Sequence, residues 1–160
     1  MSRQLNLTPL TIGRIPFAMS TRFMKLNDNW NAEPNVPEPA VGRSRNDVIL
    51  EFRLNSSRFK QFSEDDRGRL VFRNCWRYRL GGTNDEGWYL GQCRFSKVAP
   101  AWGEFYDVQG DLKLESSPDD WVIVGPEPHA VVKHFLFYLR DQTFECDADT
   151  VEPLVVLAGT

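Results

Sequence analysis

The stretch Ala130–Ala148, AVVKHFLFYLRDQTFECDA, decides the fold of this chain. Side chains alternate between the two faces of an extended backbone, so every second residue lies on the same side. One side of the first half is then nearly all apolar, and we expect it to be buried: Val131, Lys133, Phe135, Phe137 and Leu139. A polar break at residues 140–142 separates this half from a second alternating run at 143–148. The pattern predicts a β-hairpin with a short polar loop.

The composition of the whole chain agrees with a β-rich core. Its 160 residues are the usual size of one domain, and its apolar and charged fractions, 41% and 26%, are ordinary for a globular protein. The chain contains 11 Phe, 5 Trp and 4 Tyr, and aromatic side chains suit pleated sheets better than helices. These values favour a sheet-dominated domain over a disordered chain.

Charge and hydropathy bear on partners and location. A formal net charge of -3 gives no electrostatic reason to expect nucleic acid or an anionic membrane as a partner. No apolar run approaches the roughly 20 residues that cross a bilayer, and the beginning of the chain lacks the apolar core of a signal peptide. Three scattered cysteines, Cys75, Cys93 and Cys146, do not resemble a disulfide framework. We therefore expect a soluble, cytoplasmic protein.

Residues 1–46 differ from the rest of the chain. They contain five of its ten prolines and no clean period of either 2 or 3.6 residues, and proline interrupts regular elements. We interpret them as an extended N-terminal arm that packs on, or leads into, a single β-rich domain at residues 47–160. Phe17, Phe23 and Trp30 are candidate anchors of the arm, and a frayed terminus is the alternative.

Two-residue alternation recurs through residues 47–160. It predicts a half-buried strand at 48–54 and a longer strand at 70–80. The loop GGTNDEG that follows is rich in turn residues, so the chain is expected to reverse there and return as a strand at 88–95. These two strands form the second predicted hairpin.

The remaining elements are short. One helix is expected near Phe59 and Phe62, where Ser56 or Ser57 can cap its first turn. Further strands are predicted at 105–108 and 112–114, paired with each other, and at 121–124, which is wholly apolar and expected to be buried. The sequence LVVL at 154–157 either adds an edge strand or docks as a tail.

Together these elements define the fold class. Eight to ten short strands, joined by loops rich in Gly, Pro, Asn and Asp, predict a mainly β protein with an antiparallel sheet folded over on itself. A β-sandwich and an open β-barrel both fit, with at most one or two short helices. Long helical patterns between strands are absent from the sequence, which argues against a doubly wound α/β fold.

Arginines provide the first candidate site. The spacing of Arg73, Arg77 and Arg79 puts all three on one face of the expected 70–80 strand, where guanidinium groups can clamp a carboxylate or phosphate. The alternative is a solvated sheet face on which they pair with acids of a neighbouring strand. With two tyrosines as candidates for stacking, the ligand-binding set is Arg73, Arg77, Arg79, Tyr89, Tyr138 and Arg140.

The candidates for catalysis are weak. They are Glu104, His134 and Asp141, because an acid beside a histidine is the minimum for general acid and base catalysis. Nothing in the sequence brings the three together. His129 and His134 are five residues apart and point to opposite faces of a strand, so no metal site is expected. The chain has neither a phosphate loop nor a dinucleotide fingerprint, so no cofactor is expected.

The five tryptophans fit either a core or a contact surface, since Trp and Arg are enriched at protein interfaces. Without a recognisable catalytic motif, the leading hypothesis is a non-enzymatic binding module that presents an aromatic and arginine surface to a protein partner or to a second copy of itself. The alternative is a protein or enzyme that binds a small, anionic ligand in a pocket of the sandwich or barrel. A third hypothesis is a structural subunit with a permanent interface.

Overall fold

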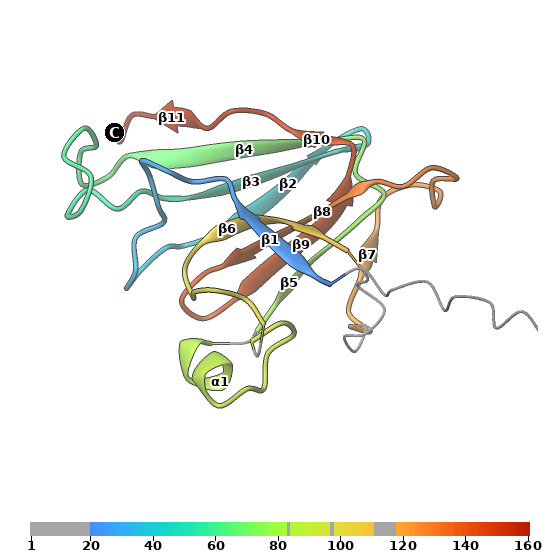
Figure 1. The fold of residues 1–160 in the computed structure, drawn as a ribbon. Helices are drawn as coiled ribbons and strands as arrows, with labels where there is room; N and C mark the ends of the chain where they lie inside the picture. Colours follow the sequence, from blue (N-terminus) through green and yellow to red (C-terminus); the bar gives the residue numbers. More distant parts are fainter. Residues whose placement is uncertain (1–19, 83, 97, 111–117) are drawn as a thin grey trace, which may run out of the picture.

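The chain folds into two antiparallel β-sheets that lie face to face, as seen in the computed structural model, which describes residues 20–82, 84–96, 98–110 and 118–160 (Figure 1). Over these residues one sheet has six strands in the order β1-β6-β8-β9-β5-β7. The other has five, in the order β10-β4-β3-β2 with β11 also beside β4. The mainly β, antiparallel fold class is confirmed, and the architecture is the sandwich.

All the strands are short. The six-stranded sheet contains β1 (Arg22–Lys25), β5 (Arg77–Gly81), β6 (Phe105–Gln109), β7 (Val122–Ile123), β8 (Lys133–Tyr138) and β9 (Thr143–Ala148). The five-stranded sheet contains β2 (Ala40–Ser44), β3 (Asp47–Arg53), β4 (Arg67–Arg73), β10 (Thr150–Val151) and β11 (Val155–Leu157). One helix, α1 (Asp85–Tyr89), occurs in the described residues, and none there has the length and hydropathy to cross a membrane.

The hairpin predicted from residues 130–148 is confirmed as β8 and β9, at the centre of the six-stranded sheet. In its register, His134 pairs with Asp147. A hydrogen bond of 2.8 Å from Leu139 N to Gln142 O closes the polar loop. Val131 lies before the first strand and is exposed, so the expectation that it shares the buried face was wrong.

Phenylalanine rings fill most of the space between the sheets. The ring of Phe72 on β4 lies 5.1 Å from that of Phe144 and 5.3 Å from that of Phe135, measured between centroids. Phe52 on β3 lies 5.1 Å from Phe137. At such separations aromatic pairs attract one another beyond the gain from burial alone. The alternation predicted for β3 is confirmed, because every second side chain of this strand is fully buried in the same layer.

A second apolar layer covers the outer face of the six-stranded sheet. Its members come from β6, β8 and the segment 84–102, which includes α1 and lies across this face: Phe95, Tyr106, Val108, Leu136 and Tyr138, with Phe23, Trp88, Ala99 and Trp102 against them. Figure 1 shows α1 on the side of this sheet that is turned away from the five-stranded sheet. Strands β8 and β9 are therefore buried on both faces.

The single strand expected at 70–80 is in fact two strands in different sheets. Strand β4 ends at Arg73, and β5 begins at Arg77. Between them Asn74 has φ 49°, a left-handed conformation that asparagine tolerates better than most residues. The chain leaves the five-stranded sheet there and enters the six-stranded one.

The return strand expected at 88–95 is also wrong. Residues 85–89 form α1, because the side-chain oxygen of Asn84 accepts a hydrogen bond from Gly87 N at 2.8 Å and two acids occupy the first turn. Strand β5 pairs with β9 and β7 instead. The turn residues of the GGTNDEG loop thus end a strand and cap a helix.

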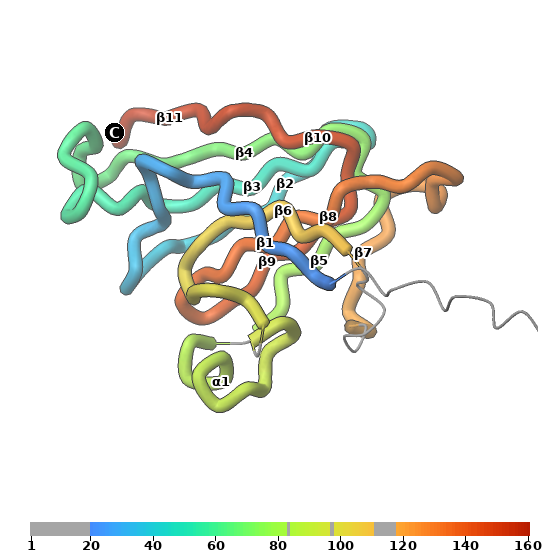
Figure 2. Tube along the Cα trace, viewed as in Figure 1, coloured from blue at the N-terminus to red at the C-terminus, as the bar shows by residue number. Residues whose placement is uncertain are grey.

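Four other expectations meet different outcomes. The predicted helix near Phe59 is a series of turns, in which Phe59 N donates to Asn55 O at 3.0 Å. Strand β6 is confirmed, but it pairs with β1 and β8, and its expected partner at 112–114 lies outside the described residues. Strand β7 is exposed at the sheet edge and was wrongly expected to be buried. LVVL adds an edge strand, β11, which runs along β4 (Figure 2).

Residues 20–46 supply one edge strand to each sheet, β1 and β2. Phe23 packs on the outer apolar layer, and Trp30 is buried between the sheets, 5.7 Å from Phe52. Phe17 lies outside the described residues. The packing of Phe23 and Trp30 places β1 beside β6 at the side of the sandwich where β10 and β11 end the other sheet.

Candidate functional site

The three arginines of the first candidate site are not on one face. Arg73 ends β4 in the five-stranded sheet, where its guanidinium bonds to Asp47 and, through Nε at 2.8 Å, to Glu152. Arg77 and Arg79 lie on β5 in the other sheet. The turn at Asn74 separates them, so a common clamp for one anion does not form.

Arg79 belongs to a buried network of charges on the outer face of β5, β8 and β9. His134 lies at its centre, with Nδ1 2.6 Å from Asp147 and Nε2 2.9 Å from Glu145. Glu145 also accepts hydrogen bonds from Arg79 at 2.8 Å and from Arg94 at 3.0 Å. Each of the two carboxylates has more than one cationic partner, since Asp147 is also bonded to Arg77.

The outer end of the network is more exposed. Arg77 Nε donates to Asp147 at 2.5 Å, and Arg79 Nε donates to Asp120 at 2.7 Å. The guanidinium carbon of Arg77 also lies 4.4 Å from the ring centre of Trp76 and 4.2 Å from that of Trp121. Such stacking on indole rings stabilises a cation.

The pKa values in this network favour the charged forms. Burial alone lowers the pKa of His134, but its bonds to Asp147 and Glu145 outweigh burial and raise it above 6.5. Burial alone raises the pKa of Glu145 and of Asp147, and His134 and the arginines outweigh it, so both values are lowered. Both ring nitrogens of His134 face carboxylates, which leaves neither ring nitrogen to exchange a proton with a substrate.

The other two candidates for catalysis lie apart from His134. The carboxylate of Glu104 accepts a hydrogen bond from Asn27 Nδ2 at 2.7 Å and lies 3.3 Å from Lys25 Nζ. Asp141 is exposed in the hairpin loop, beside Arg140. The structure therefore assembles no site from the three candidates, because two of them are engaged with other partners and the third faces solvent.

Three of the predicted residues do meet, at a polar cleft of about 430 Å³. They are Glu104, Tyr138 and Arg140, joined there by Trp102 and several loop residues. Tyr138 N donates to Glu104 O at 3.3 Å. Tyr89 is on α1 and is exposed, away from the lining of this cleft.

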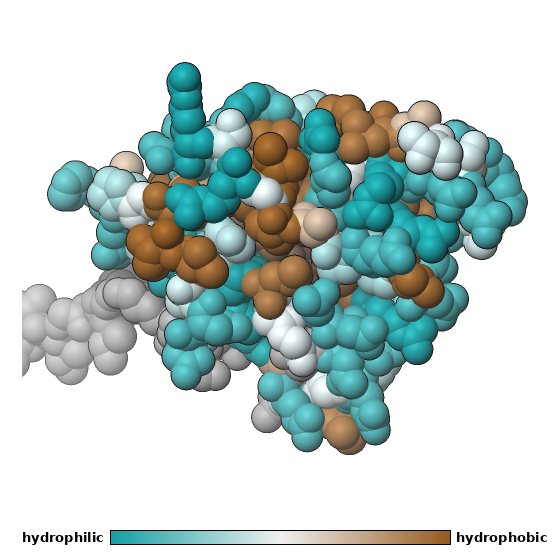
Figure 3. Space-filling view, turned by 180° about the vertical axis from the view of Figure 1, so that it is seen from behind, coloured by the Kyte–Doolittle hydropathy of each residue, from teal (hydrophilic) through white to brown (hydrophobic). Residues whose placement is uncertain are grey.

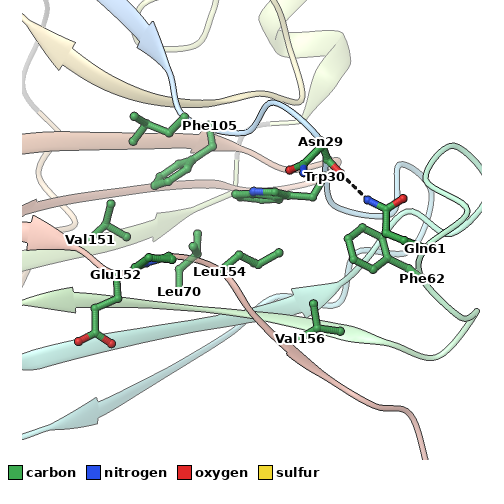
Figure 4. A pocket seen from close by; sticks show the side chains of 12 residues that line it. Asn29, Trp30, Gln61, Phe62, Leu70, Phe105, Val151, Glu152, Leu154 and Val156 are labelled. Atoms are coloured by element: carbon green, nitrogen blue, oxygen red, sulfur yellow. Dashed lines mark hydrogen bonds between the residues drawn. The ribbon is translucent and has the colours of Figure 1, made fainter.

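A second hollow, which sequence reasoning missed, lies between the two sheets at one side of the sandwich. This interlayer groove has a volume of about 570 Å³ and is mostly apolar, lined by Leu26, Asn29, Trp30, Gln61, Phe62, Leu70, Phe105, Val151, Glu152, Pro153, Leu154 and Val156. Figure 4 shows Trp30 and Phe105 on one side of the groove and Leu70, Val151 and Leu154 on the other. A bond of 2.8 Å from Gln61 to Asn29 O closes one end.

The interlayer groove is bordered by edge strands that expose apolar side chains. Leu26, just after β1, and Val156 of β11 are exposed and belong to its lining, and Met24 on β1 and Val155 on β11 are exposed outside the lining. On the face turned away in Figure 1, by contrast, apolar atoms form separate patches among polar ones (Figure 3). The one feature of the sequence that indicated the groove was LVVL. Adjacent valines point to opposite sides of a strand, so both sides of this edge strand carry apolar side chains.

The tryptophans are divided between core and surface. Trp30 is buried in the core, and the other four are half-buried.

Within the described residues, no three His, Cys, Asp or Glu side chains are grouped to hold a metal ion. No protein-family model matches the chain, and searches of curated proteins and of solved structures find no match either.

Proposed function

We propose that this chain is a non-enzymatic binding module that takes an extended, apolar segment of a partner protein into the interlayer groove. The observation that carries the proposal is that the edge strand β11 and the residue that follows the edge strand β1 contribute exposed apolar side chains, Val156 and Leu26, to the lining of an apolar groove. Among the aromatic side chains that line the groove, Phe62 is half-buried and offers contact area, whereas Trp30 and Phe105 are buried in the core.

Edge strands favour this type of partner. A strand at a sheet edge presents backbone N–H and C=O groups to which another chain can add, and proteins usually protect such edges with charges, prolines or covering loops. Among the described residues, β1 pairs only with β6 and β11 only with β4. An added strand would satisfy the backbone of one of them and place alternate side chains in the groove.

The lining of the groove supports binding rather than catalysis. Its one carboxylate, Glu152, is hydrogen bonded to Arg73 and points away from the groove rings in Figure 4. Grooves of this volume with apolar walls are typical of sites that bind by excluding water. The groove does not favour an anionic occupant, because its lining contains one carboxylate and neither arginine nor lysine.

Peptide selection with a matched pair of variants tests the proposal. A phage library of random 12-residue peptides, selected on the immobilised protein, is expected to yield sequences with apolar residues at alternate positions. Val156→Glu, at a position 46% exposed in the groove, should weaken binding of a selected peptide at least about tenfold, because a carboxylate does not enter an apolar site without losing hydration. Val122→Glu, at the 40% exposed β7 edge, should not.

Two results would contradict the proposal. One is a library from which no such peptide is enriched, and the other is equal loss of binding in both variants. Sedimentation of the free protein identifies the remaining occupant: a dimer that Val156→Glu dissociates and Val122→Glu does not would make a second copy of this chain the natural ligand of the groove.

A further inference from the structure

The polar cleft is built from five segments, most of them loops, at one end of the sandwich. Tyr138 of β8 and Asp85 of α1 contribute to its lining, and the other lining residues lie outside these strands and this helix: Asn31, Ala32, Glu33, Pro34, Asn35, Asn55, Arg58, Trp102, Gly103, Glu104, Leu139 and Arg140. Loops held at the end of a rigid sheet are the usual place for ligand-binding residues. Its volume, about 430 Å³, is that of a small-molecule site.

Some polar atoms of the cleft are occupied within the protein. Arg140 donates to Asn35 Oδ1 at 3.1 Å, and one oxygen of Glu104 accepts from Asn27. The side-chain oxygen of Asn55 accepts from Arg58 N at 3.0 Å. These bonds fix the shape of the cleft, since each joins two segments or closes a turn.

Other polar atoms have no protein partner among the described residues. They are one oxygen each of Glu104 and Asp85, the amide nitrogen of Asn55 and the guanidinium nitrogens of Arg58, whose carbon lies 5.2 Å from the Phe59 ring. The cleft thus offers hydrogen-bond donors and acceptors together. The half-buried indole of Trp102 adds an aromatic surface beside them.

We propose that this cleft binds a neutral, polyhydroxylated ligand, a sugar or a short glycan. A hydroxyl group donates and accepts at once, so a sugar matches mixed amide, carboxylate and guanidinium groups, and its C–H face packs on an indole ring. An anion fits less well, because the lining holds three carboxylates, Glu33, Asp85 and Glu104, against two arginines. The site is independent of the interlayer groove.

Titration with a fixed panel tests this inference. The probes are glucose, galactose, mannose, N-acetylglucosamine, lactose and cellobiose, followed by chemical shifts of the labelled full chain. At least one probe should bind saturably with a Kd of about 10 mM or tighter, and shifts should be confined to the amides of the cleft. Arg58→Ala should weaken that binding about fivefold, as for one lost hydrogen bond, and Arg22→Ala, another exposed arginine, should leave it unchanged.

Two further variants distinguish sugar binding in the polar cleft from effects of the interlayer groove. Glu104→Gln should also weaken binding about fivefold, while Val156→Glu, which alters the interlayer groove, should have no effect on it. If none of the six sugars binds at 50 mM, or if inorganic phosphate or citrate shifts the same amides more strongly, the inference is overturned. Neither result bears on peptide binding in the interlayer groove.

Discussion

The two faces of the β8–β9 hairpin are both buried, but by opposite chemistry. The inner face packs Phe135, Phe137 and Phe144 against the rings of the five-stranded sheet. The outer face carries Leu136 and Tyr138 of the outer apolar layer and, beside them, the charged groups of His134, Glu145 and Asp147, which are also buried. One hairpin thus shows two ways to bury side chains, through apolar contact and through pairing of opposite charges.

The two faces differ in how their stability is distributed. On the inner face each ring contributes by its own contact area, so a change of shape costs roughly what it removes. On the outer face the charges depend on one another, because a buried charge whose partner is removed stays in a medium that solvates it poorly. Substitutions of similar size should therefore cost more on the outer face.

Glu145→Gln should have the largest effect. It keeps the shape of the side chain but removes the charge that His134, Arg79 and Arg94 share, and we expect the free energy of unfolding to fall by about 3 kcal/mol. Phe137→Leu, a larger change of shape on the inner face, should still cost only about 1 kcal/mol. Urea denaturation of both variants measures the difference in the free energy of unfolding. A greater loss for Phe137→Leu would mean that the inner face, and not the outer face, is the more sensitive to substitution.

Arg79→Met should have the next largest effect. Its side chain is only 12% exposed and bonds to Glu145 and Asp120, so the variant should lose about 2 kcal/mol. Arg73→Met is the control, since Arg73 has as many acidic partners but lies in solvent and should leave the midpoint of unfolding unchanged. Equal losses in thermal unfolding would mean that burial does not distinguish these two arginines.

The pH dependence of stability should be the smallest effect. His134 has a raised pKa in the folded chain, so its contribution is complete below its ordinary value of 6.5 and is lost as the pH rises through the folded value. Glu145 and Asp147 have lowered pKa values, so their contributions are present above their ordinary values of 4.5 and 3.8 and are lost as the pH falls through the folded values. Stability should be greatest between these limits.

The measurement is the free energy of unfolding at about pH 6 and at about pH 8. The wild-type chain should be less stable at the higher pH, and His134→Gln should lose most of that difference. Constant or rising stability over this interval would indicate that the imidazole is not held in its charged form.

Local patterns in the sequence were sufficient for the hairpin and the fold class. The aromatic run of β8 and the alternation of β3 describe strands whose faces are set by their own residues. The prediction of one continuous strand at 70–80 was wrong because the alternation of side chains continues on both sides of Asn74, although the chain changes sheet there. Asn74 itself was the available signal, since asparagine favours the left-handed turn that it adopts.

The candidate sites were less predictable, because their members are distant in the sequence. Glu145 belongs to the alternating run at 143–148, and its partners Arg79 and Arg94 are 66 and 51 residues away. A strand with acids at alternate positions can be buried only when those acids pair with cations, and here the arginines are far away in the sequence. The interlayer groove likewise depends on how two sheets end side by side, and the polar cleft combines Glu104, Tyr138 and Arg140 with loops that no periodicity marks.

The most direct test of this account is an NMR titration of the His134 imidazole, because the sealed, ionised network on the outer face also removes the chain's best candidate for acid and base catalysis. We predict that the ring stays protonated above pH 6.5, with both N–H protons protected from exchange by Asp147 and Glu145. A neutral ring at pH 6.5 with one nitrogen open to solvent would contradict it, and would return His134 to the list of groups able to act on a substrate.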